Sequence, residues 1–352
     1  MTTEHTSSRQ NETATPPRTP PRTQPRSVVR RAAPWVAGAW ALVFGALSGL
    51  ALLGRAPDPW VPDAASPLGA LSGTQMSWVI AVLALLALIS AGTAATARTP
   101  RTTRTAGWLL VALGLVVAVV VSDVRALMFL GYLPQVLLAT VDVGPGAGQL
   151  EWALFVDSGV ALAHAVGGLA MVVTGVSLLG RAEPGGRLDW SRWARWGRPA
   201  VAVAVVVPVL YAVTRIAWAL DVPLGISREM LDELGEGRWA GFGLGAFAVV
   251  GAVLTWGLIA RWGEVFWRWV PRIGGRPVPL AMALVPGILV ASAATSAGLS
   301  FWRMAIADDL WTVPGATSDW AAWAPEMLWP LWGVALAVAC LAYLGRRTST
   351  RG

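Results

Sequence analysis

Apolar residues run in long, nearly uninterrupted stretches along the chain, and short polar segments separate them. A helix needs about 20 consecutive apolar residues to cross the hydrocarbon core of a bilayer. Eight stretches reach this length, so the pattern predicts an all-α, polytopic transmembrane helix bundle over residues 32–345. The predicted spans are 34–53, 77–97, 107–133, 152–180, 199–220, 240–260, 279–306 and 327–345.

Both ends of the chain are polar. Residues 1–31 repeat Thr, Pro and Arg and lack the apolar residues that a core requires, so we expect a disordered, basic tail. Residues 346–352 form a second, short tail.

Arginine is distributed unevenly over the polar segments. The two tails and the three inner loops hold 21 Arg, whereas the four alternate loops hold three. The inner loops are 98–106, 181–198 and 261–278. Cytoplasmic loops carry an excess of basic residues, so the pattern predicts a plasma-membrane protein with both termini in the cytoplasm.

Composition agrees with a membrane protein and excludes several kinds of chemistry. Only 13% of the residues are charged, against about 25% in soluble domains. The net charge of +7 fits loops that face anionic lipids, so we expect no nucleic-acid partner. The chain has no Lys, one Cys and two His, which excludes Schiff-base chemistry, a CxxC pair and a bis-histidine haem. We therefore expect no cofactor, no metal site and no catalytic residue.

A few charged or titratable side chains fall inside the predicted spans, where each charge costs roughly 2.5–3.5 kcal/mol on insertion scales. They are Asp123, Arg125, Asp157, His164, Arg215 and Arg303. Their positions put the charged members in the outer third of four spans, so they predict an outward-facing polar cavity. Asp123 and Arg125 are two residues apart and would not meet on one helix. The expected pairs are therefore Arg125 with Asp157 and Arg215 with Asp123.

Three arginines in one cavity would suit the oxygens of an anionic small molecule or a lipid headgroup. In the alternative interpretation, the arginines reach the outer headgroups and the other residues form structural bridges between helices.

Two inner loops resemble each other, from Trp190 to Pro199 and from Trp267 to Pro277. Each is followed nine residues later by another proline, Pro208 and Pro286. The offset predicts a parallel repeat of helical hairpins, spans four–five and six–seven, although loops rich in Arg, Trp and Pro would produce the same pattern without duplication.

The two Gly-Arg-Pro loop ends, at Gly197 and Gly275, and the stretch from Arg215 to Leu220 resemble uncharacterised multi-pass membrane proteins of actinobacteria. The resemblance implies a fold type and no activity. Three function classes follow from the chain as a whole. The first is a small-molecule permease or transporter-like protein. The second is a membrane scaffold, sensor or complex subunit with a membrane-protein partner. The third is a carrier or enzyme that binds a lipid phosphate.

Overall fold

The computed structural model describes residues 28–60, 62, 66–139, 152–312 and 315–349. Within these residues the protein is all-α, as predicted. The first half contains five α-helices and a π-helical segment, η1. They are α1 (Val28–Leu52), α2 (Gly73–Thr96), α3 (Pro100–Leu115), η1 (Val116–Val121), α4 (Val124–Ala139) and α5 (Trp152–Ala182).

The second half contains five further α-helices and short 3-10 turns. The helices are α6 (Gly197–Ala219), α7 (Arg228–Leu234), α8 (Gly237–Trp256), α9 (Leu280–Ile306) and α10 (Trp329–Ser349). The 3-10 turns are η2 (Ser191–Trp196), η3 (Arg261–Gly263), η4 (Asp309–Thr312), η5 (Trp320–Ala322) and η6 (Glu326–Leu328).

Eight helices in the described residues are long and apolar enough to cross a membrane, with α3 and η1 counted as one span. Their outward faces carry exposed large apolar side chains such as Trp35, Leu42 and Leu254. Exposure of this apolar surface to water would be unfavourable, whereas contact with lipid tails is favourable. The chain is therefore an integral, multi-pass membrane protein.

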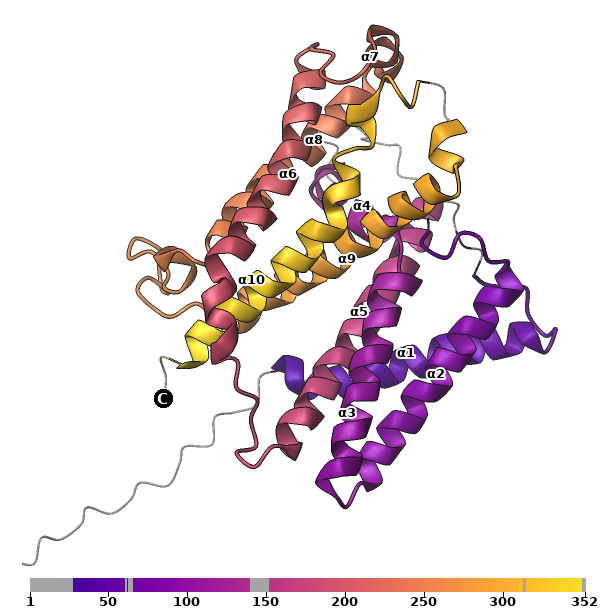
Figure 1. Ribbon diagram of the computed structural model, residues 1–352, viewed down its shortest axis with the longest axis vertical. Coiled ribbons are helices and arrows are strands. Elements are labelled where there is room, and N and C mark those ends of the chain that lie inside the picture. The colour runs from indigo at the N-terminus through magenta and orange to yellow at the C-terminus, as the bar shows by residue number, and fades with distance from the viewer. Residues whose placement is uncertain (1–27, 61, 63–65, 140–151, 313–314, 350–352) are drawn as a thin grey trace, which may run out of the picture.

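The spans form two bundles (Figure 1). In the N-terminal bundle, α1 packs against α2 and α5, and α3 packs against α5. In the C-terminal bundle, α6 packs against α8 and α10, and α9 packs against α10. Each bundle has its own apolar core, centred on Ile80 and Met171 in the first and on Val201 and Tyr343 in the second.

The short helix α4 joins the two bundles, because it packs against α5 on one side and against α9 and α8 on the other. Small residues make this contact close. Ala126 of α4, Ala161 of α5 and Ala293 of α9 form a fully buried cluster between the bundles.

The prediction of one long third span, 107–133, is wrong. The helix widens to the π-helical segment η1 and stops at Ser122, whose backbone is extended with φ −65° and ψ 166°. The Ser122 hydroxyl donates to the carbonyl of Ala161 at 3.0 Å, and α4 begins two residues later. An interrupted helix is tolerated in a membrane where protein surrounds the freed backbone groups, and Ser122 is fully buried.

The predicted hairpin repeat does not correspond to packed hairpins. The helices α5 and α6 belong to different bundles, and α8 and α9 do not pack along their lengths. The two similar inner loops also fold differently. Residues 191–196 form the 3-10 helix η2, which packs on α10, whereas the second loop closes with a bridge between Val265 and Pro277.

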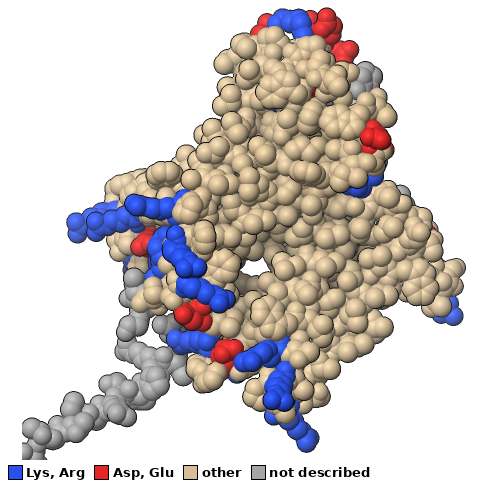
Figure 2. Space-filling view, viewed as in Figure 1, with Lys and Arg blue, Asp and Glu red and all other residues tan. Residues whose placement is uncertain are grey.

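The molecule has two polar ends. We call the end where α1 begins and α10 ends the terminal face, and the opposite end the distal face. Figure 2 shows most basic side chains near the terminal face, at the lower left and bottom, and a mixed acidic and basic group over α7 at the top. The apolar surface between them matches the spans.

Candidate functional site

The structure brings four of the six predicted cavity residues together: Asp123, Arg125, Asp157 and His164. They line a pocket of about 270 Å³ at the distal end of the N-terminal bundle, which we call the distal pocket. Its other walls come from the loop after α1, from α2, from the end of η1 and from α5. These wall residues are Pro59, Trp60, Pro62, Ser66, Met76, Val121, Val160 and Ala161.

Asp123 and Arg125 form an ion pair, which corrects the expectation that they would not meet. The Arg125 Nη2 lies 2.5 Å from Asp123 Oδ2, and Nε lies 3.0 Å from the same oxygen. The backbone N–H of Arg125 also donates to Asp123 Oδ1 at 2.9 Å. This geometry exists because the span is broken at Asp123, which caps the start of α4 instead of lying within a helix.

The predicted contact between Arg125 and Asp157 is confirmed. Arg125 Nη1 lies 3.9 Å from Asp157 Oδ2, which is beyond hydrogen-bond distance and therefore a purely electrostatic contact. The two carboxylates differ in environment, because Asp123 is 4% exposed while the Asp157 side chain is 63% exposed. Asp157 is the acidic group that a ligand entering the pocket would meet first.

His164 lies on the inner side of the distal pocket. The indole N–H of Trp40 donates to His164 Nδ1 at 3.1 Å. An indole nitrogen can only donate, so Nδ1 is the acceptor and the neutral imidazole carries its proton on Nε2. The ring also packs against Phe44 and Trp60, with centroids 4.6 and 5.8 Å away. His164 is thus a satisfied core histidine that also contributes to the pocket wall.

Tight packing closes the bundle below His164. A Cβ at Gly167 would lie 2.3 Å from the Trp40 ring, and one at Gly168 would lie 2.5 Å from the backbone of α3. The helices α1, α3 and α5 therefore approach one another closely just below His164.

Arg215 lies outside this pocket, and the predicted pair with Asp123 is wrong. Its guanidinium pairs with Glu326 and also donates to the carbonyl of Ala321 at 3.1 Å. The sequence reasoning missed Glu326 because it immediately precedes the predicted eighth span and was counted with the polar loop. The signal that would have found it is its position at the apolar boundary, on the same side of the membrane as Arg215.

Arg303 also lies outside the distal pocket. It sits near the distal end of α9, where its guanidinium pairs with Asp309 at 3.0 Å. The Asp309 side chain is about half exposed, so this pair belongs to the polar edge of the C-terminal bundle. The six predicted residues therefore divide between one pocket and two separate ion pairs.

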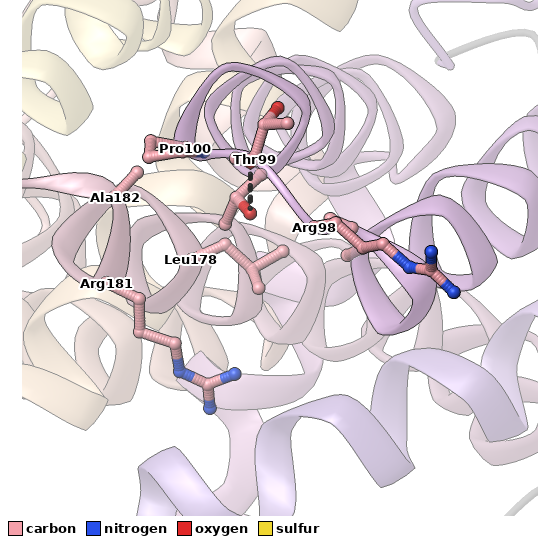
Figure 3. Close-up of a pocket in the computed structure, with 9 residues that line it drawn as sticks. Arg98, Thr99, Pro100, Leu178, Arg181 and Ala182 are labelled. Carbon is pink, nitrogen blue, oxygen red and sulfur yellow. Dashed lines mark hydrogen bonds between the residues drawn. The ribbon is translucent and has the colours of Figure 1, made fainter.

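A second cavity, of about 340 Å³, lies at the terminal face between the α2–α3 loop and the end of α5. Arg98 and Arg181 line it, yet Figure 3 shows their guanidinium groups pointing away from each other. The Thr103 hydroxyl already donates a hydrogen bond to the backbone carbonyl of Thr99 at 3.1 Å. Diverging, exposed arginines do not form a clamp for an anion, so this cavity is the weaker candidate.

The part of the chain that the structure describes contains no group of three or more His, Cys, Asp or Glu side chains arranged to hold a metal ion. Comparisons of the chain with protein-family models, with curated proteins and with solved structures find no match.

Proposed function

We propose that the protein is a small-molecule permease or transporter-like protein and that the distal pocket is its outward-facing binding site. The observation that carries the proposal is the broken third span, because the Asp123–Arg125 pair at the start of α4 lines a pocket. Interrupted helices that present their ends to a ligand are a recurring device of membrane transporters.

The charge of the pocket favours a cationic ligand. Among the described residues that line it, two carboxylates stand against one guanidinium, and that guanidinium is already held by Asp123. The expectation of an anionic ligand depended on three arginines in one cavity, and only Arg125 is there. The exposed Asp157 carboxylate would attract a protonated amine.

Size adds a second restriction. Small-molecule sites usually enclose roughly 300–1,000 Å³, so a pocket of about 270 Å³ suits a compact ligand. A lipid headgroup with its chains would need an opening along the lipid-facing surface, whereas this pocket lies under the loop after α1. A small organic cation is therefore the proposed substrate class.

The fold offers a route from ligand binding to movement. Asp123 and Arg125 sit at the start of α4, and α4 packs on helices of both bundles. A ligand that changes the Arg125 contacts would shift the start of α4 and, through it, the position of one bundle against the other. Rocking of two bundles about a central site is a common form of alternating access.

Binding is the first experiment. The full chain in lipid nanodiscs is screened calorimetrically against small protonated amines and against carboxylates of matched size. Asp157→Asn should weaken amine binding about tenfold or more, which corresponds to ~1.4 kcal/mol. Glu229→Gln is the matched control, because it removes another exposed carboxylate, from α7. Tighter binding of carboxylates than of amines would contradict the charge argument.

Uptake then separates transport from binding alone. Proteoliposomes that hold the full chain should accumulate the amine that binds, and Asp157→Asn should reduce the uptake in proportion to its lost affinity. Binding without uptake would indicate a sensor or complex subunit instead of a permease. Failure of every amine to bind would show that the polar pocket is structural.

A further inference from the structure

A second buried charge site lies in the C-terminal bundle, separate from the distal pocket. Arg215 of α6 and Glu326 of η6 form an ion pair in which the two residues are only 8% and 3% exposed. Burying two charges costs several kcal/mol per ion unless every polar atom finds a partner. Arg215 and Glu326 differ in how many of their polar atoms have such a partner.

Arg215 is held on all sides. Beyond its contacts with Glu326 and the Ala321 carbonyl, its guanidinium lies over the rings of Tyr211 and Trp218, with 4.5 and 4.2 Å to their centroids. On the α8 side, a Cβ at Gly245 would lie 3.2 Å from the Cβ of Arg215, and one at Gly241 would lie 3.8 Å from its Cδ, so the side chain runs close to this helix. The cation is therefore fixed in place by aromatic faces and by one carboxylate.

Glu326 is satisfied on one side only. Its Oε1 accepts from Arg215, whereas its Oε2 is buried and has no hydrogen-bond donor in the part of the chain that the structure describes. A buried carboxylate oxygen without a donor carries a large desolvation cost. A small cation that reaches Oε2 would remove that cost.

A proton fits this oxygen better than a metal ion does. Ca²⁺ and Mg²⁺ take six or more oxygen ligands, and Zn²⁺ takes four nitrogen, sulfur or oxygen ligands. The described residues offer no cluster of three acidic or metal-binding side chains, and the positive Arg215 adjoins the oxygen. A proton needs only a single oxygen.

We propose that Glu326 is a proton-binding site, which takes up a proton on Oε2 to become a neutral carboxyl group and returns it to water on release. The titratable groups that face the pair are Tyr211 of α6 and Tyr132 of α4, and both interact electrostatically with Arg215. No second acidic side chain pairs with Arg215 in the described part of the chain. Glu326 is thus the carboxylate on which the charge of this site depends.

The helix α4 links this site to the distal pocket. Its first turn carries Arg125, next to Asp123, while Tyr132 lies further along the same helix, in the field of Arg215. Tyr132 lies seven residues beyond Arg125, which is about 10 Å of helix at 1.5 Å per residue. The coupling of proton binding to ligand binding, which rests on the proposed function, would pass through this one rigid element.

Infrared spectroscopy tests the proton site without any ligand. The full chain in nanodiscs is titrated with pH, and the protonated-carboxyl band is followed. We expect the native titration to contain a protonated-carboxyl component that disappears as the pH rises, that is missing from Glu326→Gln, and that is still present in Glu229→Gln and Asp157→Asn. A Glu326→Gln titration identical to that of the native protein overturns the proposal.

A second variant guards against misfolding. Should Glu326→Gln fail to yield a folded protein, Glu326→Asp keeps the carboxyl group and changes its position. The band should then shift in frequency, and an unshifted band overturns the proposal.

Coupling needs a separate readout. In proteoliposomes, a pH gradient should stimulate uptake of the bound amine several-fold in the native protein and should have no effect in Glu326→Gln. A Glu326 band that titrates while no amine binds would overturn the proposed function and leave the proton site standing. Amine uptake that does not depend on the pH gradient in the native protein would overturn only the coupling between proton binding and transport.

Discussion

His164 and Trp40 show how a polar side chain is accommodated deep in an apolar bundle. The Trp40 indole supplies the donor that Nδ1 needs, and the surrounding rings exclude water. Protonating Nδ1 would place two donors face to face, so the pairing keeps the imidazole neutral. His164 thus acts mainly as part of the pocket wall.

We predict that Trp40→Phe destabilises the protein by about 1–3 kcal/mol, because it leaves a buried imidazole nitrogen without its donor. Trp35→Phe is the matched control, since Trp35 belongs to the same helix and is 81% exposed. Thermal unfolding in detergent measures both. Equal shifts for the two variants would mean that the indole donor contributes nothing.

Asp221 illustrates the opposite case, a charge at the water-exposed edge. It follows α6 with a positive φ of 64° and pairs with Arg228 at 3.0 Å and with Arg238 at 3.1 Å. The hydrogen bond from Arg228, followed by the charges of Arg228 and Arg238, lowers the pKa of Asp221 below its usual 3.8. These ion pairs tie the loop before α7 to the start of α8.

The sign of the pH effect follows from that direction. A lowered pKa in the folded state stabilises the fold above about pH 4 and is lost as the pH falls through the folded value. Amide hydrogen exchange in α7, corrected for the intrinsic rate, should therefore accelerate in acid. Asp221→Asn should show weak protection at every pH, because Asn tolerates the positive φ but carries no charge. An acid-dependent change that persists in Asp221→Asn would contradict this assignment.

At the scale of elements, α3 and α5 cross at a close contact in the N-terminal bundle. Gly114 and Gly168 face each other there, and a Cβ at Gly168 would lie 2.5 Å from both Ala118 N and Gly114 O. Both obstacles are backbone atoms, which cannot rotate away. Small residues at such crossings let helices approach within a membrane, where apolar burial alone does not drive association.

We predict that Gly168→Ala destabilises the N-terminal bundle by about 1–3 kcal/mol through overpacking, which exceeds the gain in helix propensity. Gly159→Ala on the same helix is the control, because nothing lies within 4 Å of its new Cβ. It should be neutral or stabilising by up to ~1 kcal/mol. Unfolding in detergent with increasing denaturant compares them, and a stable Gly168→Ala protein would mean that α3 and α5 can separate without cost.

At the scale of the whole molecule, the distribution of arginine predicts which face meets the cytoplasm. The terminal face gathers most basic side chains, so it should be cytoplasmic, and the distal pocket should open to the outside. In this predicted orientation the pocket would face outward.

Cysteine labelling tests the orientation. Glu229 and Arg187 are exposed residues of the distal and terminal faces, and the native Cys340 is buried. Glu229→Cys should react with a membrane-impermeant maleimide in intact cells, whereas Arg187→Cys should react only after lysis. The reverse labelling pattern would mean that the distal pocket opens to the cytoplasm.

Much of the architecture was predictable because it depends on local properties of the chain. Span length follows from the thickness of the bilayer, so the eight apolar stretches predicted eight spans without any knowledge of packing. Charges inside spans are costly, so their few positions predicted where polar side chains would gather. Four of the six did so around one pocket.

The pairing of those charges was decided by the tertiary structure alone. The break at Ser122 exists because its hydroxyl meets the Ala161 carbonyl on another helix, and only that break lets Asp123 bind Arg125. Arg215 and Glu326 are more than 100 residues apart in the sequence, and no periodic pattern in the chain indicates that they meet. Hydropathy is a property of each segment and can be read from it, whereas an ion pair depends on which segments fold against one another.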